Sequence, residues 1–505
     1  MMAEGPTISR ARRRAITAGL MLGISLGALE ATVVGTAMPT VIATLGGLAH
    51  YSWVFSAYLL TSTATVPIWG RLSDLYGRRG MYLGGIAVFL IGSVLSGIST
   101  SMLQLIAART VQGLGAGAII PLSMTIIGEL YTLSERARMQ AVFSAVWGVA
   151  SIAGPLVGGY ITDTISWRWV FYLNLPFGLL ALLVITLAYP PHKQAAAVRV
   201  DWLGAGLMFA GVSALLLALG GETGAGLWWS AAAALMLGGF VLVERRASDP
   251  MLSLDLLGTP LMARTLAVTF LFGTSMFGAI AFVPLFVQGV MHATATQAGQ
   301  VLTPLFLGWV TMSIVAARLV VRIGYRIVAI SGSVLLTAGF AGLSSMMADS
   351  TRTRLLTSCF VVGAGMGFTM LSLLLATQHG VERSRLGIAT SLNLFARSIG
   401  AAVGVALMGA LLTRSLTGVD LPGGAGALSA GGGVALTGAV RDQFAFALHQ
   451  VFLAGTALAG AALALTFFLP PVDFGHGVTD AAGEKMIAAE MTNLEPQDEP
   501  VAVPD

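Results

Sequence analysis

The chain has 505 residues, of which 56% are hydrophobic and only 10% are charged, whereas a soluble domain carries about 25% charged residues. A water-soluble fold cannot bury that much apolar surface, so the composition excludes a soluble globular protein. The formal net charge of +4 does not indicate a nucleic-acid partner, because membrane proteins place basic residues in their cytoplasmic loops.

The first apolar segment follows Arg12, Arg13 and Arg14, which is also the charge order of a secretory signal. It continues for about 22 residues, whereas the apolar region of a signal peptide has roughly 7–15. It also contains Glu30 and is followed by many more such segments. We therefore expect an uncleaved first span, preceded by a cytoplasmic N-terminus over residues 1–14.

The sequence contains fourteen apolar segments long enough to cross a bilayer as helices, which takes about 20 residues each. The first six lie at 15–37, 52–70, 81–99, 104–127, 139–160 and 169–189. A central pair lies at 201–220 and 227–243. The last six lie at 265–289, 297–317, 327–347, 355–376, 387–411 and 445–469. The pattern predicts an all-α integral membrane protein with 14 spans.

The order of these segments predicts two six-helix bundles. The N-terminal bundle covers 15–189 and the C-terminal bundle covers 265–469, with two additional transmembrane helices in the region 190–264 between them. The glycine-rich segment 412–444 is expected to be an external loop. The segment 470–505 is acidic and poor in aromatic residues, so we expect a disordered cytoplasmic tail.

The distribution of basic residues predicts the orientation in the membrane. If the N-terminus is cytoplasmic, the inside segments carry twenty Lys and Arg residues. The outside segments then carry only five, Arg168, Arg352, Arg354, Arg414 and Arg441. This bias follows the positive-inside rule and predicts a multi-pass protein of a bacterial cytoplasmic membrane with both termini inside the cell.

A short basic turn that contains glycine follows the second span of each six-helix block. The first of these turns is Gly70–Arg79 and the second is Arg318–Arg326. Two blocks of six helices with similar turns at the same position indicate an internal duplication.

The first of these turns carries a spaced set of glycines and charges, Gly70, Asp74, Gly77, Arg78 and Arg79. The set resembles the loop motif of the major facilitator superfamily. It departs from the motif at Leu75, where a basic residue is common.

Further motifs lie inside the predicted spans. The fifth span has a glycine and proline pattern at Gly148, Gly154, Pro155, Gly158 and Gly159, which resembles the superfamily's antiporter motif. The fourth span contains Arg109–Gly115, which resembles its arginine-glutamine-glycine motif. Leu29–Pro39 in the first span and Trp167–Pro176 before the sixth are similar to the fourteen-span drug/proton antiporter family. The first-span motif usually has aspartate where this sequence has Glu30.

The resemblance covers nearly the whole chain and implies a major facilitator fold. It implies a transporter, not an enzyme, that exports small amphipathic or lipophilic compounds. The expected energy source is the proton gradient, without a cofactor or a metal. We expect the protein to act as a monomer among membrane lipids, with protons and the exported compound as its partners.

The loop motif predicts a conformational latch on the cytoplasmic side. Gly70 and Gly77 would allow a tight turn between closely packed helices. Asp74 can face the N-terminus of a helix, and the resemblance makes Glu129 the partner of Arg78. The alternative is that these charges simply lie in a solvated, positive-inside loop.

Only Glu30, Arg109 and Arg397 are ionisable residues that fall well inside the predicted spans. A charge in lipid is costly and therefore indicates function. Glu30 and Arg109 are about seven and six residues from the external ends of their spans, so both lie roughly 10 Å below the outer surface. They would interact if their helices adjoin. Such a pair either couples transport to protons or is a permanent ion pair that fastens two helices.

Other polar residues are candidates for lining a substrate cavity. They are Gln112, Asn393 and Arg397, and for Arg397 a role in helix packing is an equal alternative. The glycines of the fifth span permit close helix contact and a bend at Pro155, or serve packing alone.

Three alternative functions compete with export of amphipathic compounds. A lipid or long-amphipath exporter would use the same fold and Glu30. A membrane-embedded enzyme would need clustered ionisable residues, but the six histidines are scattered along the chain. An ATP-driven pump is excluded because neither Lys193 nor Lys485 follows glycine, so the chain has no phosphate-binding loop motif.

Overall fold

The computed structural model describes residues 9–131, 133–190, 201–220, 226–246, 254–379, 381, 386–416 and 438–470. These residues form helices and turns and contain no strand. The predicted tail beyond residue 470 and most of the predicted loop 412–444 lie outside the described residues.

The helices fall into two groups of similar order. The first bundle consists of α1 (Arg10–Leu45), α2 (Tyr51–Tyr76), α3 (Arg78–Ile98), α4 (Met102–Leu130), α5 (Leu133–Thr164), α6 (Trp169–Tyr172) and α7 (Asn174–Ala188), with a short 3-10 turn η1 (Leu48–His50). The central helices are α8 (Trp202–Gly220) and α9 (Gly226–Glu244), followed by η2 (Leu254–Gly258). The second bundle consists of α10 (Pro260–Gly289), α11 (Ala295–Ile323), α12 (Tyr325–Ser344), α13 (Arg352–His379), α14 (Leu386–Ser415) and α15 (Gly438–Thr466).

The described part of the chain contains 13 helices long and apolar enough to cross a membrane, with α6 and α7 together forming one of them. The segment predicted as the second span forms α2, a continuous helix of 26 residues that is not among the 13. Several hydroxyl side chains of α2 donate to carbonyls of the preceding turn of the helix, Thr61 to Ala57 and Thr65 to Thr61 among them. The fourteenth span therefore stays a prediction.

Several helices extend beyond their predicted spans, α1 and α15 among them. α1 begins at Arg10, inside the predicted N-terminal segment 1–14, and α15 begins at Gly438, inside the predicted loop 412–444. Alanine, arginine and glutamine at these ends are good helix formers, so the helices continue past the apolar region that hydropathy detects.

The predicted span 169–189 is broken between α6 and α7. α6 ends at Tyr172 and α7 begins at Asn174. Pro176 has no N–H to donate to the carbonyl of Tyr172, so the helical hydrogen-bond ladder is interrupted there.

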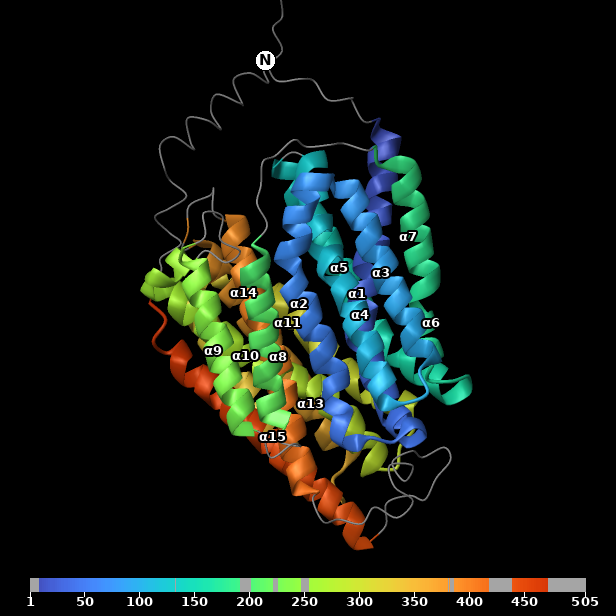
Figure 1. Cartoon of the computed structure of the whole chain (residues 1–505). Coiled ribbons are helices and arrows are strands. Elements are labelled where there is room, and N and C mark those ends of the chain that lie inside the picture. The colour runs from blue at the N-terminus through green and yellow to red at the C-terminus, as the bar shows by residue number, and fades with distance from the viewer. Residues whose placement is uncertain are drawn as a thin grey trace, which may run out of the picture.

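The two bundles lie side by side, with the central pair along one edge of the contact between them (Figure 1). In the first bundle α1 packs on α5 and α7, and α4 packs on α2 and α3. In the second, α13 packs on α11 and α12, and α10 packs on α14 and α15. The bundles touch mainly through α5 with α11 and α2 with α14, and α1 also packs on α10 and α11. The central helix α8 contacts both α2 and α14.

The two basic turns have nearly the same geometry. Gly77 (φ 90°, ψ 139°) is the one residue between α2 and α3, and Gly324 (φ 79°, ψ 155°) is the one residue between α11 and α12. A positive φ favours glycine, which explains both positions. The expectation that Gly70 also serves the tight turn was wrong, because Gly70 lies inside α2 and an added Cβ there would meet nothing within 4 Å.

Candidate functional site

The centre of the candidate site is an ion pair between Glu30 on α1 and Arg109 on α4. Nη1 of Arg109 donates to Oε1 of Glu30. Each residue is 2% exposed, so both charges are removed from solvent. The two residues that the sequence places at similar depth are therefore in direct contact, because their helices adjoin.

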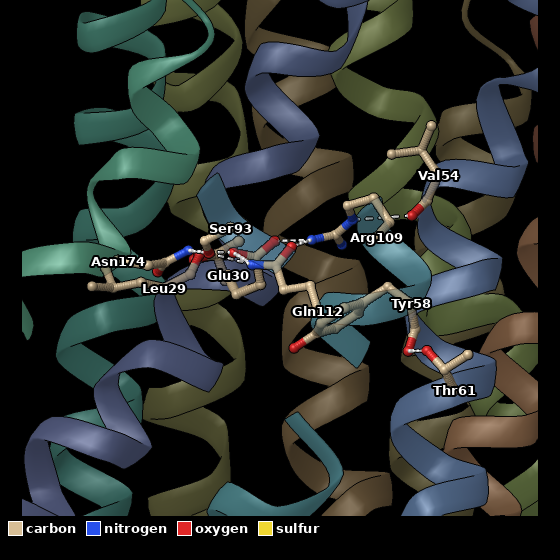
Figure 2. Close-up of polar contacts among 10 residues, drawn as sticks. Leu29, Glu30, Val54, Tyr58, Thr61, Ser93, Arg109, Gln112 and Asn174 are labelled. Atoms are coloured by element: carbon tan, nitrogen blue, oxygen red, sulfur yellow. Dashed lines mark hydrogen bonds and ion pairs between the residues drawn. The ribbon is translucent and has the colours of Figure 1, made fainter. Parts of the chain in front are cut away.

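The second oxygen of Glu30 is held by two amide side chains. Nε2 of Gln112 and Nδ2 of Asn174 donate to Oε2 of Glu30 over 2.8 Å and 2.7 Å. The same two nitrogens donate to the hydroxyl of Ser93 over 2.8 Å and 3.0 Å. One carboxylate thus joins residues of α1, α3, α4 and α7 in a single network (Figure 2).

The sequence indicated only part of this network. Gln112 is completely buried and binds the carboxylate, and its expected role in lining a substrate cavity stays a prediction. Ser93 and Asn174 were missed, because a serine in an apolar span and an asparagine at a predicted span end carry no signal of their own. The break between α6 and α7 makes Asn174 the first residue of a new helix, directed at Glu30.

Arg109 has acceptors besides Glu30. Its Nε donates to the carbonyl of Val54 over 3.2 Å, and its Nη1 donates to Oε1 of Gln112 over 2.7 Å. The guanidinium carbon lies 4.2 Å from the ring centroid of Tyr58, within the range of a cation–π contact. If Glu30 takes up a proton, the guanidinium therefore keeps three favourable contacts.

At the predicted cytoplasmic ends of α3 and α4, Arg78 forms an ion pair with Glu129. The hydroxyl of Tyr189 donates to Oε2 of Glu129 over 3.0 Å. Arg79 donates to the carbonyl of Thr186 on α7 over 2.7 Å.

The predicted latch therefore joins helices of the same bundle. The resemblance paired Arg78 with Glu129, and the structure has this contact between α3 and α4. The side chain of Asp74 lies outside the described residues. The Arg78–Glu129 pair fixes the Gly77 turn against α4 and α7.

The antiporter motif of α5 lies where three helices meet. Gly154 and Gly158 face Thr32 and Val33 of α1 so closely that an added Cβ would overlap those side chains. On the other side of α5, Gly159 approaches the backbone of Ala295, and the backbone of Pro155 approaches Gly299 of α11. Gly148 is loosely packed, with Val310 of α11 3.4 Å from where a Cβ would lie. The motif residues thus permit close contact both inside the first bundle and between the bundles.

Asp163, near the end of α5, binds the first turn of α11 in the opposite bundle. Its Oδ1 accepts from the backbone N–H of Ala295 over 3.0 Å. Its Oδ2 accepts from the N–H and the hydroxyl of Thr296 over 2.7 Å and 2.5 Å. We call these three bonds the Asp163 clasp. The first N–H groups of a helix lack partners within the helix, so a carboxylate is well suited to this position.

Other hydrogen bonds join the bundles at the same predicted external side. Nε2 of Gln288 on α10 donates to the carbonyl of Thr36 on α1 over 2.8 Å. The hydroxyl of Ser56 on α2 donates to the carbonyl of Ala402 on α14 over 3.1 Å. Together with the Asp163 clasp, these bonds fasten the two bundles to each other at that side.

In the second bundle, Asn393 and Arg397 lie one turn apart on α14. Nδ2 of Asn393 donates to the hydroxyls of Thr269 on α10 and Thr377 on α13, over 3.2 Å and 2.9 Å. Nη1 of Arg397 lies 3.2 Å from the sulfur of Met370 on α13. These two residues are not part of the Glu30 network. Among the described residues no group of three His, Cys, Asp or Glu side chains could hold a metal ion.

Comparison with known proteins agrees with this arrangement. The family model described as Major Facilitator Superfamily matches residues 20–405. The chain is 37% identical over 410 residues to the "Multidrug transporter protein MdtP" of Bacillus subtilis (strain 168), covering 80% of this chain and 76% of that protein. It is 36% identical over 421 residues to "Multidrug resistance protein 3" of the same organism, covering 81% and 82%.

A solved structure shares the fold. The inward-facing, unoccupied form of a bacterial homolog of the human lysosomal transporter Spinster matches with a TM-score of 0.66 and 15% identity, over 91% of this chain and 97% of that one. These relatives and neighbours are transporters and not enzymes. With its apolar helices and the family match over most of its length, the chain is a multi-pass membrane protein that belongs to the Major Facilitator Superfamily.

Proposed function

We propose that the protein is a proton-driven antiporter that exports amphipathic or lipophilic compounds, drugs among them, by alternating access. In this proposal it has 14 spans, α2 included, and works as a monomer in a bacterial cytoplasmic membrane with both termini inside. The names of two relatives, multidrug transporter and multidrug resistance protein, support drugs over lipids as cargo. The observation that carries the proton coupling is the burial of Glu30, a carboxylate inside a predicted span.

Antiport requires that proton and substrate each favour release of the other. In our proposal Glu30 loses its proton when substrate loads from the cytoplasm and regains one from outside when substrate leaves. The ionised carboxylate binds Arg109, Gln112 and Asn174, and so draws α1, α4 and α7 together. Protonation weakens the attraction to Arg109, which retains Val54 and Tyr58 as partners. The packing of α1 against its neighbours then depends on the proton.

The Asp163 clasp serves as an external gate in this cycle. The clasp ties α5 to α11 at the side where the other inter-bundle hydrogen bonds also lie. It must break before the bundles separate there and substrate leaves. The close contact of Gly159 with Ala295 sets the spacing at which the carboxylate reaches the helix terminus.

The cytoplasmic latch favours the opposite state, the one that is open to the outside. Arg78 and Glu129 hold the Gly77 turn in place, so that it can meet the second bundle when the cytoplasmic side closes. We propose that Asp74 and Arg79 also contribute to this latch. Breaking the pair should therefore disfavour the state that is open to the outside.

Replacing the coupling carboxylate should uncouple transport from the proton gradient. In proteoliposomes with an imposed proton gradient, Glu30→Gln should lower the accumulation of a drug by roughly 10-fold or more, within the usual range of coupling between two ligands. Substrate binding to the purified variant should be retained, because glutamine keeps the size of the side chain and cannot take up a proton. Glu30→Asp should keep substantial activity.

Asp442→Asn is the control for this experiment, because it removes an exposed carboxylate at the start of α15. It should accumulate drug as the wild type does. Wild-type accumulation by purified Glu30→Gln would show that the coupling site lies elsewhere. A drug gradient that dissipates equally in all variants would reject proton-driven export itself.

The gate can be followed with an introduced thiol at Ala298. Ala298 on α11 is fully buried, and Cys359 is the single cysteine of the chain and is buried as well. In the Ala298→Cys background, Asp163→Ala should raise the rate of labelling by a water-soluble maleimide by roughly 10-fold, because hydrogen bonds to a charged group contribute about 1.5–3 kcal/mol. Asp163→Asn should fall between the two, and Asp442→Asn should have no effect. Equal labelling with and without Asp163 would remove the clasp from the mechanism.

Breaking the latch should change the labelling rate of the Ala298→Cys thiol in the opposite direction. Glu129→Gln in the Ala298→Cys background should lower the labelling rate and transport, because the state open to the outside becomes less populated. The charge exchange Arg78→Glu with Glu129→Arg should restore much of both. If Glu129→Gln labels and transports like its parent, the interpretation as a solvated basic loop is correct.

A further inference from the structure

Arg397 lies deep within the second bundle. It follows the start of α14 at Leu386 by 11 residues, which corresponds to about 16 Å along the helix axis. The backbone carbonyl of Arg397 packs against Gly273 of α10, so closely that no Cβ would fit there. The position of this arginine is therefore fixed by the contact of α14 with α10.

The guanidinium of Arg397 has no carboxylate partner among the described residues. Among the described residues its one hydrogen-bond acceptor is the sulfur of Met370, and a thioether is a weak acceptor for a group with five N–H donors. Arg109 in the first bundle has instead a carboxylate, an amide oxygen, a carbonyl and an aromatic ring. Unlike Arg109, Arg397 is also partly exposed.

The second bundle offers no acidic side chain at this depth. The helices α10, α11, α12, α13 and α14 contain no Asp or Glu at all. The one acidic residue of α15, Asp442, lies in its first turns, near the predicted external end. A rotation of helices within this bundle therefore cannot supply a carboxylate to Arg397.

An unpaired cation inside a membrane protein is costly unless a ligand or a partner neutralises it. The two bundles differ in this respect, since the first pairs its buried arginine with Glu30 and the second leaves Arg397 unneutralised. The free N–H groups of a guanidinium match the two oxygens of a carboxylate, a sulfonate or a phosphate.

We propose that Arg397 binds the negatively charged group of the exported compound, and that the preferred substrates are amphipathic organic anions with an oxyanion on a lipophilic body. The inference rests on the proposed export function and names its substrate class. The oxyanion displaces Met370 from the guanidinium. Asn393, held by Thr269 and Thr377, keeps the preceding turn of α14 in place. A permanent cation of the same size binds less well, because Arg397 repels it.

The test uses two fluorescent compounds with the same body, anilinonaphthalene sulfonate and N-phenylnaphthylamine, of which the second lacks the sulfonate. Their dissociation constants for the purified full-length protein are measured by isothermal titration calorimetry against a detergent-only blank. The wild type should bind the sulfonate at least roughly 10-fold more tightly than the neutral compound, and Arg397→Gln should remove this preference, as expected for the loss of one charge-assisted hydrogen-bond pair. The affinity for the neutral compound should stay unchanged.

Two further variants give the controls. Arg397→Lys keeps the charge and should retain part of the preference for the sulfonate. Arg414→Gln removes an exposed arginine from the end of the same helix and should bind both compounds as the wild type does. The proposal is overturned if the wild type shows no preference for the sulfonate, or if Arg397→Gln weakens both compounds equally, which would indicate a packing role.

Transport by the same variants separates this inference from the proposed function. Arg397→Gln in proteoliposomes should still accumulate N-phenylnaphthylamine under a proton gradient while losing accumulation of the sulfonate. If the wild type binds the sulfonate through Arg397 but accumulates neither compound, the binding site stands and proton-driven export is wrong.

Discussion

The structure depends on the burial of one negative charge, that of Glu30. A carboxylate at 2% exposure in a membrane protein is tolerated only with several strong partners, and here they come from two other helices, α4 and α7. Arg109 supplies the opposite charge, and the amides of Gln112 and Asn174 complete the coordination. The same bonds that offset the cost of burying the Glu30 carboxylate also hold α1, α4 and α7 together. A change in the charge of Glu30 therefore changes the packing of the first bundle.

The contact between the bundles is built differently, from close backbone approach and a single carboxylate. The glycines of α5 let α11 come near enough for Asp163 to accept from its first N–H groups. The three ion pairs given by the described residues, Arg13–Glu135, Arg78–Glu129 and Arg109–Glu30, lie in the first bundle. The second bundle contributes apolar surface, hydroxyl groups and Arg397, which has no carboxylate partner among the described residues. Such a division suits a transporter in which one bundle handles the proton and the other helps to hold the cargo.

The sequence predicted the helical architecture and pointed to Glu30 and Arg109 as candidate site residues. Hydropathy located the helices and placed Glu30 and Arg109 at similar depth, so that they could meet if their helices adjoin. The shared turn at Gly77 and Gly324 was visible as two similar basic segments. Sequence patterns missed Asp163, because its role depends on an inter-bundle contact that no local spacing reveals. They also assigned Gly70 to the turn, although helix α2 continues through it.

If substrate and proton compete through Glu30, the protein releases protons when it binds substrate, and this release can be measured directly. Purified protein in weakly buffered detergent solution is mixed with N-phenylnaphthylamine, which does not titrate near neutral pH, and the pH change is recorded. The wild type should release protons, up to about one per protein, and Glu30→Gln should bind the compound without releasing any. Equal proton release by the wild type and Glu30→Gln would show that substrate and proton do not compete at Glu30.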